Sequence, residues 1–106
     1  MVSYGPKFRI YAAPVVNDPE KSKLLDRLIT QAWSDENVSA SAPKWFGCEF
    51  FGFYMQRYPG ALAMLGIRNE ALGSGAEHHN VHFDLDESVL DRGVLCHLMY
   101  AAAHCM

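Results

Sequence analysis

The stretch with the clearest chemical potential is residues 78–87, which contains three histidines and three carboxylates. Neutral imidazole is a ligand for zinc, manganese, nickel or cobalt, and carboxylate oxygens accompany it around harder ions. The first candidates for metal ligands are therefore His78, His79 and His82. Oxygen donors lie close by in the sequence: Asp84, Asp86 and Glu87. A polar loop whose histidines are simply solvated is the competing interpretation.

Glu49 is the second candidate, because it is the only ionised side chain between Trp45 and Gln56. A carboxylate in such apolar company needs a partner or water. It is expected either to contact a substrate or support a metal ligand, or to occupy the one wet position on a helix surface.

Three other groups of polar residues are weaker candidates for a catalytic or binding site. His97 and His104 are seven residues apart and share one face of a helix, which is typical of a partly exposed surface. Ser39 and Ser41 lack a nearby base and the context of a nucleophilic serine. Residues 73–75 are Gly-Ser-Gly without the lysine of a phosphate-binding loop.

Short strands are expected to support these residues. Lys7 to Ala13 and Asn37 to Ala42 alternate apolar and polar residues, and each is ended by a proline. Ala61 to Ile67 is a continuous apolar run bounded by turn residues, which predicts a buried strand. Arg68 to Ala76 is expected to be a flexible loop.

Helices are expected between and after the strands. Asp18 and Pro19 suit the start of a helix whose apolar stripe is Leu24, Leu25, Leu28, Ile29, Ala32 and Trp33. Trp45 to Arg57 is dense in aromatic residues and predicts a helix buried on most sides. Asp86 can cap a last helix, in which one face is expected to hold Leu90, Val94, Leu98 and Ala102 together with Val89, Leu95 and Met99.

This order predicts an α/β architecture, a small layered domain of about three strands and three helices. The length of 106 residues indicates a single domain, residues 1–106. The net charge of −3 argues against a nucleic-acid partner, which would need a basic stripe. No apolar run approaches the roughly 20 residues that span a bilayer. Three cysteines without close pairing, and the lack of a secretory signal, favour a cytoplasmic protein.

Four blocks, taken in order, resemble the C-terminal portion of the metal-dependent amidohydrolases in the aminoacylase/carboxypeptidase clan. Residues 15–19 resemble the return from the family's lid domain, and residues 47–51 resemble its Ser-Glu-Asp-Phe block. Residues 58–69 resemble a Pro-Gly-Ala strand that ends in Leu-Gly-x-x-Asn, and residues 79–84 resemble His-Asn-Pro-x-Phe-Asp. The branch that looks most similar is that of hippurate hydrolase and the indole-acetyl-amino-acid hydrolases.

The resemblance implies a role for each matching residue. His79 takes the place of a ligand of a two-metal centre, with manganese, zinc, nickel or cobalt as the metal, and Asn80 helps to orient the loop. Glu49 is placed beside the substrate or behind the ligands. The implied reaction is hydrolysis of an N-acyl amino acid, with a glutamate from elsewhere as proton shuttle.

The sequence also departs from the family pattern. Phe50 replaces the aspartate of the Ser-Glu-Asp-Phe block, and Val81 replaces the proline after His79-Asn80. The family's Cys-x-His pair, paired glutamates, middle histidine and lid domain have no counterpart here. We therefore expect a fragment of a larger α/β metallohydrolase catalytic domain that has one metal ligand and is inactive alone, with a second copy or a complementing chain as partner.

Two rival functions remain open. A non-enzymatic interaction module could bind a partner chain through the aromatic residues of 45–58. The adjacent histidines His78 and His79 also suggest a small pterin-carbinolamine dehydratase, although the other residues of that motif are not correctly placed.

Overall fold

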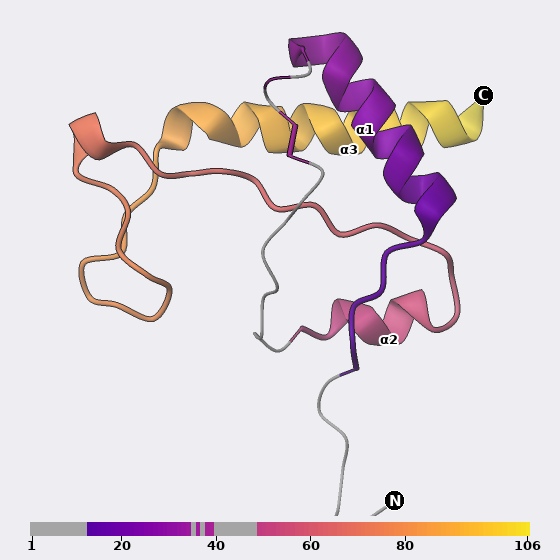
Figure 1. Ribbon diagram of the computed structural model, residues 1–106, viewed down its shortest axis with the longest axis horizontal. Coiled ribbons are helices and arrows are strands. Elements are labelled where there is room, and N and C mark those ends of the chain that lie inside the picture. The colour runs from indigo at the N-terminus through magenta and orange to yellow at the C-terminus, as the bar shows by residue number, and fades with distance from the viewer. Residues whose placement is uncertain (1–12, 35, 37, 40–48) are drawn as a thin grey trace, which may run out of the picture.

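The computed structural model describes residues 13–34, 36, 38–39 and 49–106. Figure 1 shows two long helices that cross each other, a short helix, and a long connecting trace that ends in a loop. The α-helices are α1 (Pro19–Trp33), α2 (Phe51–Met55) and α3 (Leu90–Cys105). Two 3₁₀ turns, η2 (Glu70–Leu72) and η3 (Glu87–Val89), flank the loop.

Helix α1 begins where the sequence predicts. One carboxylate oxygen of Asp18 accepts from the backbone N–H groups of Glu20 and Lys21, at 3.0 and 2.9 Å, and Pro19 is the first helical residue. These bonds satisfy donors that have no partner inside the helix. The half-buried side chains include five of the six residues of the expected apolar stripe: Leu24, Leu25, Leu28, Ile29 and Trp33. The expectation of an amphipathic helix here is confirmed.

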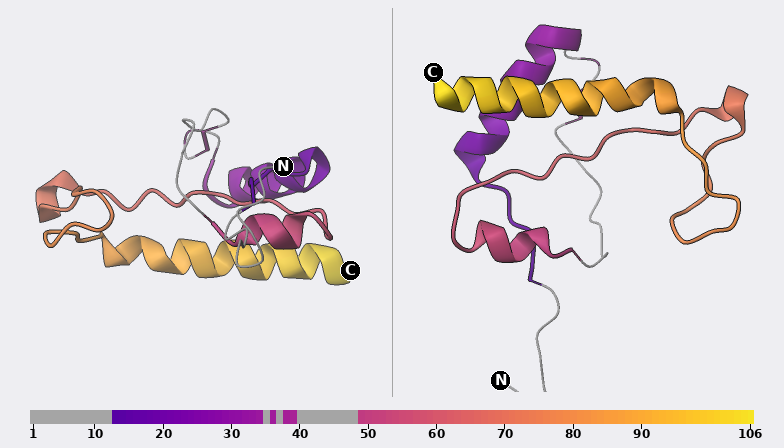
Figure 2. Two further views of the ribbon diagram at one scale, coloured as in Figure 1. Left: turned by 90° about the horizontal axis from the view of Figure 1, so that it is seen from below. Right: turned by 180° about the vertical axis from the view of Figure 1, so that it is seen from behind.

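Helix α1 packs across α3, and the two lie at different levels in the left-hand view of Figure 2, with the extended trace running between them. Leu65, on that trace, approaches α3 at Gly93, where an added Cβ would lie 3.4 Å from the leucine Cδ2. The trace therefore lies beside the helix at this residue, where a Cβ would make an ordinary van der Waals contact.

The expected α/β architecture of about three strands and three helices is wrong for the described residues, which contain no strand. Ala61 to Ile67 runs across the molecule as an extended segment (Figure 1), but among residues 13–34, 36, 38–39 and 49–106 no strand lies beside it. A strand is defined by ladder hydrogen bonds to a partner, so an apolar extended run without one is not a strand. The other expected strands, 7–13 and 37–42, fall almost entirely outside the described residues.

The aromatic segment forms a shorter helix than the expected one from Trp45 to Arg57. Helix α2 covers Phe51–Met55, and residues 45–48 lie outside the described part of the chain. Gly52 is buried because the backbone carbonyls of Ala13 and Pro14 approach it so closely that no Cβ would fit. Close backbone packing therefore requires a glycine at this position.

The side-chain amide of Asn17 connects the segment before α1 to the start of the extended segment at Leu62. The Asn17 Nδ2 group donates to the Leu62 carbonyl, and Asn17 Oδ1 accepts from the Leu62 N–H, both at 2.9 Å. The Asp18 N–H donates to the Gly60 carbonyl, also at 2.9 Å. Asn17 thus offers Leu62 the donor and acceptor that a neighbouring strand would offer, and it fixes where the extended segment begins.

Three side chains fix where that segment ends, and we call Asn69, Ser74 and Asp86 the loop-root cluster. Asn69 Nδ2 donates to Asp86 Oδ2 at 2.7 Å, and the Asn69 N–H donates to Ser74 Oγ at 2.6 Å. The Asp86 N–H donates to the Ile67 carbonyl at 3.0 Å. Ser74 is buried although it lies in the expected flexible loop, and Gly73 next to it adopts a left-handed conformation. The cluster therefore orders a segment whose composition predicts flexibility.

The hydrogen bonds of the cluster hold the Asp86 carboxylate in its charged form. The Ser88 hydroxyl at 2.6 Å, the Asn69 amide and the Ser88 N–H together lower the pKa of Asp86 below its usual 3.8. The same contacts cap η3, from which α3 continues, as the sequence predicts for Asp86.

The described residues bury no hydrophobic side chain. The radius of gyration is 16.8 Å, whereas a compact domain of this length has about 13 Å. None of the helices in the described ranges is long and apolar enough to cross a membrane. Hydrogen bonds, rather than a packed core, therefore fix the positions of α1, the extended segment and the loop relative to one another.

Replacing Asn17 with alanine should free the start of the extended segment. Each of the two lost hydrogen bonds contributes about 0.5–1.5 kcal/mol net, so the Leu62 amide should exchange with solvent about tenfold faster in hydrogen-exchange NMR. The matched control is Lys23→Ala on the exposed side of α1, which should leave Leu62 unaffected. Unchanged exchange in Asn17→Ala would contradict this role.

Titration of Asp86 should show the linkage between its charge and the fold. A carboxyl whose pKa is lower in the folded than in the unfolded chain stabilises the fold above the unfolded value, and this contribution is lost as the pH falls through the folded pKa. Carboxyl-carbon NMR should place the pKa of Asp86 below 3.8. Ser88→Ala should raise it, whereas Ser22→Ala in α1 should not. An Asp86 titration at 3.8 or above would refute this.

Candidate metal-ligand loop

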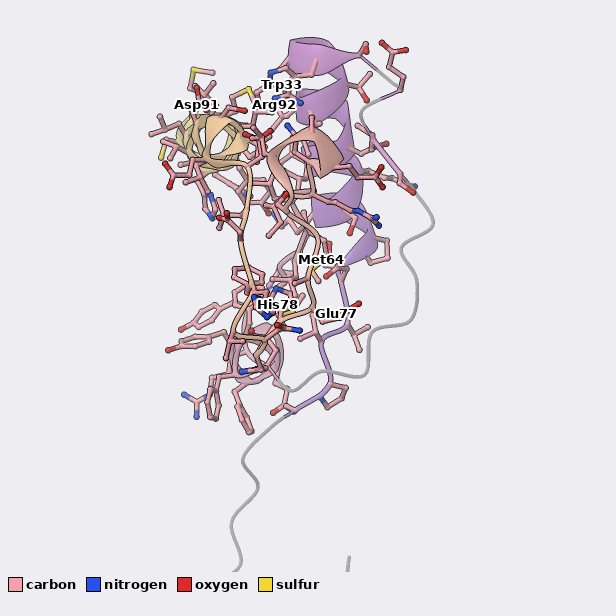
Figure 3. All side chains as sticks on the ribbon, turned by 90° about the vertical axis from the view of Figure 1, so that its left-hand side faces the viewer. Trp33, Met64, Glu77, His78, Asp91 and Arg92 are labelled. Carbon is pink, nitrogen blue, oxygen red and sulfur yellow. The ribbon has the colours of Figure 1, made fainter. Side chains whose placement is uncertain are left out.

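The candidate ligands lie on a loop that leaves η2 and returns to η3 (Figure 1). Its two ends are held together by the loop-root cluster, so the loop starts and ends at one fixed place. Figure 3 looks at the molecule from this side and shows Glu77 and His78 on the loop, apart from Asp91 and Arg92 at the start of α3. The three histidines of the loop, His78, His79 and His82, are all exposed.

His79 has an uncommon backbone conformation. Its φ is +61°, in the left-handed region, where non-glycine residues are found mainly when they are Asn, Asp or His. This conformation costs on the order of 1 kcal/mol, so the turn around His79 must be held by its neighbours. Its imidazole makes no hydrogen bond to the described residues, which leaves both ring nitrogens accessible.

Asn80 is the neighbour that holds the turn. Its carbonyl accepts from the Phe83 N–H at 3.0 Å, and its side-chain oxygen accepts from the His82 N–H at 2.9 Å. The His78 ring stacks on the Phe83 ring with 5.4 Å between centroids, which closes the same turn from outside. These contacts place Asn80 inside the loop's own structure and leave Val81 at its tip, with 95 % of its surface exposed.

Two of the three oxygen donors expected near the histidines, Asp84 and Asp86, already accept hydrogen bonds. Asp86 Oδ2 accepts from Asn69 and Oδ1 accepts from Ser88, and Asp84 Oδ1 accepts from the Leu85 N–H at 2.8 Å. Within the ranges that the structure describes, no group of three or more His, Cys, Asp or Glu side chains is placed to hold one ion. The loop thus presents single imidazoles and does not form a closed site.

Glu49 is distant from this loop in the sequence and makes its hydrogen bond at the start of α2. Its Oε1 accepts from the Phe51 N–H at 3.1 Å, at the start of α2, and the side chain is half-buried. A carboxylate at this position satisfies a free donor and opposes the partial positive charge of the helix start. The described structure gives Glu49 a local contact and does not bring it to His79.

The two histidines of α3 and Cys96 are explained without a ligand. His97 Nδ1 lies 2.8 Å from the Gly93 carbonyl, and the His104 ring packs edge-on to Tyr100 at 4.7 Å. Burial raises the pKa of the Cys96 thiol, which disfavours the thiolate needed for metal binding or nucleophilic attack. These residues behave as the partly exposed helix surface that the sequence indicates.

The sequence does not predict the structural role of Ser74, which is buried and hydrogen-bonded to the backbone. Its hydroxyl oxygen accepts from the Asn69 N–H, and the hydroxyl lies within hydrogen-bonding distance of the Ile67 and Asn69 carbonyls. The residues on either side of it, Gly73 and Gly75, both have positive φ. A serine between two glycines is the only signal in the sequence, and it more often marks a flexible linker. Asn69 was present in the family resemblance, but the resemblance did not predict its link to Asp86.

Comparison with known proteins identifies relatives over most of the chain. The IAA-amino acid hydrolase ILR1-like 6 of Arabidopsis thaliana is 32 % identical over 100 residues, which cover 94 % of this chain and 21 % of that protein. A probable hydrolase of Synechocystis is 30 % identical over 107 residues, covering 94 % of this chain and 26 % of its own length. Thermostable carboxypeptidase 1 of Saccharolobus solfataricus is 34 % identical over 86 residues, covering 81 % and 21 %.

A protein of another name also matches: a putative glutamate–cysteine ligase of Rhodococcus jostii is 36 % identical over 81 residues, but only 10 % of its length is covered. No family model matches the chain, and no solved structure matches it. The chain spans about a fifth to a quarter of the length of the first hydrolases that it matches. It belongs to the hydrolase family of the IAA-amino acid hydrolases and carboxypeptidases, and corresponds to a C-terminal portion of such a metal-dependent amidohydrolase.

Proposed function

We propose that this chain supplies one metal ligand, His79, to a two-metal N-acyl-amino-acid amidohydrolase, and that it is inactive by itself. The observation that supports the ligand most directly is the left-handed turn that holds an accessible imidazole at position 79. Backbone strain of this kind is concentrated at functional sites. The family relationship supports the reaction class, because one relative is named for the hydrolysis of an amino-acid conjugate.

The residues of the loop fit the contribution of one ligand. His79 would bind the metal through a neutral ring nitrogen, and Asn80 would keep the turn that aims the ring. The stack of His78 on Phe83 limits the movement of the turn. When bound, a pair of divalent ions activates a water and polarises the amide carbonyl. Manganese, zinc, nickel and cobalt all accept imidazole, and the loop does not discriminate among them.

Inactivity of the isolated chain follows from the number of ligands. A catalytic zinc site usually takes three protein ligands and keeps one open position. The described residues bring no three candidate ligands together, and the oxygens of Asp86 are engaged elsewhere. We assign Glu49 no ligand role, because its carboxylate accepts from the Phe51 N–H at the start of α2. A contact with the substrate is the role that remains for it.

The purified chain should not hydrolyse N-acyl amino acids. We expect no turnover of N-acetyl, N-benzoyl or indole-acetyl amino acids when manganese, zinc, nickel or cobalt is added, because the ligand set is incomplete. Release of the free amino acid is the measurement, and the Synechocystis relative is the positive control. Turnover that depends on added metal would disprove the inactivity.

The role of His79 can be tested in a chimera in which this chain replaces the matching segment of the Synechocystis hydrolase. His79→Asn keeps a residue that tolerates positive φ but removes the imidazole. We expect loss of one bound metal by mass spectrometry and a fall in kcat of about a hundredfold or more, since even residues that only support a ligand change affinity or activity by about 10–100-fold. His82→Asn is the control and should keep both metals. Equal metal content in both variants would refute the assignment.

An interaction module remains the second candidate, because α2 and the turn after it expose aromatic rings. Phe50, Tyr54 and Tyr58 have 64, 66 and 69 % of their surface exposed. Such rings gather in protein interfaces. A module of this kind should bind its partner chain equally well with and without metal. A clean monomer in sedimentation that does not bind a dye for exposed apolar surface would count against it.

A further inference from the structure

A groove of about 460 Å³ lies between the segment that leads into α1 and the turn that follows α2. One wall consists of residues 16–19 and the other of residues 55–60. The hydrogen bonds from Asn17 to Leu62, and from the Asp18 N–H to the Gly60 carbonyl, hold the two walls together. Small-molecule sites usually have volumes of about 300–1,000 Å³, so the groove is large enough for a small ligand.

Two side chains of opposite charge line the groove and do not pair with each other. The guanidinium of Arg57 is exposed and has no hydrogen-bond or ion-pair partner among the described residues. On the other wall, Asp18 Oδ1 accepts from the start of α1, whereas Asp18 Oδ2 accepts no hydrogen bond from the residues that the structure describes. The groove therefore offers a ligand one cation and one carboxylate oxygen.

The end of α2 adds a further acceptor to the groove. Pro59 has no N–H, so the Met55 carbonyl lacks the donor that another helical turn would provide, and no other donor in the described ranges reaches it. The start of α1 carries about half a unit of positive charge, which the full negative charge of Asp18 outweighs. An ammonium group is therefore favoured near Asp18, and a carboxylate is favoured beside Arg57.

Apolar surface completes the lining. Val16 and Tyr58 are largely exposed, and Pro19 and Pro59 line the groove between the charged groups and the solvent-facing rim. Covering such surface with an apolar group is favourable, because it removes both partners from water. The groove therefore suits a ligand that has an apolar part as well as two charges.

We propose that this groove binds a free α-amino acid with an apolar side chain, whose carboxylate pairs with Arg57 and whose ammonium group pairs with Asp18. A simple anion would leave Asp18 without a partner, and a simple cation would leave Arg57 without one. Arginine is well suited to the first contact, because its planar fork matches a carboxylate. The turn after α2 and the loop that holds His79 lie at opposite ends of the extended segment (Figure 1), so the groove is separate from the candidate metal ligand.

A free amino acid is also what the proposed hydrolysis would release. A groove apart from the metal-ligand loop would let this product bind without occupying the place where the amide is cleaved. This connection with catalysis rests on the proposed function, whereas binding of the amino acid rests on the charges and the apolar lining of the groove alone.

The test is an NMR titration of the purified chain with L-leucine, N-acetyl-L-leucine and L-leucinamide. We expect L-leucine to shift the amides of the two walls with a Kd of about a millimolar. The acetyl compound lacks the ammonium group and the amide lacks the carboxylate, so each should bind at least tenfold more weakly.

Variants of the two charged residues test the contacts one at a time. Arg57→Gln and Asp18→Asn should each weaken L-leucine binding at least tenfold. Asparagine is as good a helix cap as aspartate, so α1 should keep its helical content, which circular dichroism checks. Arg92→Gln is the matched control, because Arg92 is also exposed but lies outside the groove, and it should bind L-leucine normally.

Three results would overturn the proposal. One is the absence of any L-leucine-dependent shift at the amides of residues 16–18 and 55–60, and another is normal binding by Arg57→Gln and Asp18→Asn. Equal binding of L-leucine and N-acetyl-L-leucine would show that the groove takes a simple anion instead. His79→Asn separates the two proposals, since it should bind L-leucine normally; if it does so while the chimera with this substitution keeps both metals, only the proposed function is refuted.

Discussion

The hydrogen bonds between Asn69, Ser74 and Asp86 are the constraint on which the position of the candidate ligand loop depends. They join the end of the extended segment, the turn after it and the start of η3 at one place. The described residues have no buried apolar side chain, so packing cannot do this work. Directional bonds to a charged group are among the stronger ones, and they specify geometry as well as stability. The loop with His79 inherits its position from them.

The sequence predicts the helices better than it predicts the strands, and the difference is physical. Helix α1 is decided by neighbouring residues: Asp18 caps it, Pro19 starts it, and its apolar stripe is local. Ala61 to Ile67 has the composition of a buried strand and is extended, but a strand also needs a partner. No partner lies within the described residues, and composition cannot supply one. The predicted architecture is wrong for that reason, whereas the family resemblance, carried by short motifs, is confirmed.

In the candidate site, too, the features that depend on neighbouring residues are predicted and those that depend on distant segments are not. The sequence indicates an imidazole at position 79 and a capping role for Asp86, because both depend on residue type and local spacing. It does not indicate the left-handed backbone of His79 or the burial of Ser74, because both depend on contacts with other segments. Leu90, Val94 and Leu98, which the sequence places on one face of the last helix, are exposed. Periodicity identifies a helix that is apolar on several sides without saying which side meets which neighbour.

The outward leucines of α3 also have a consequence for the life of the polypeptide in a cell. A chain that shows such a surface in water is recognised by chaperones and proteases as unfinished, whatever its chemistry.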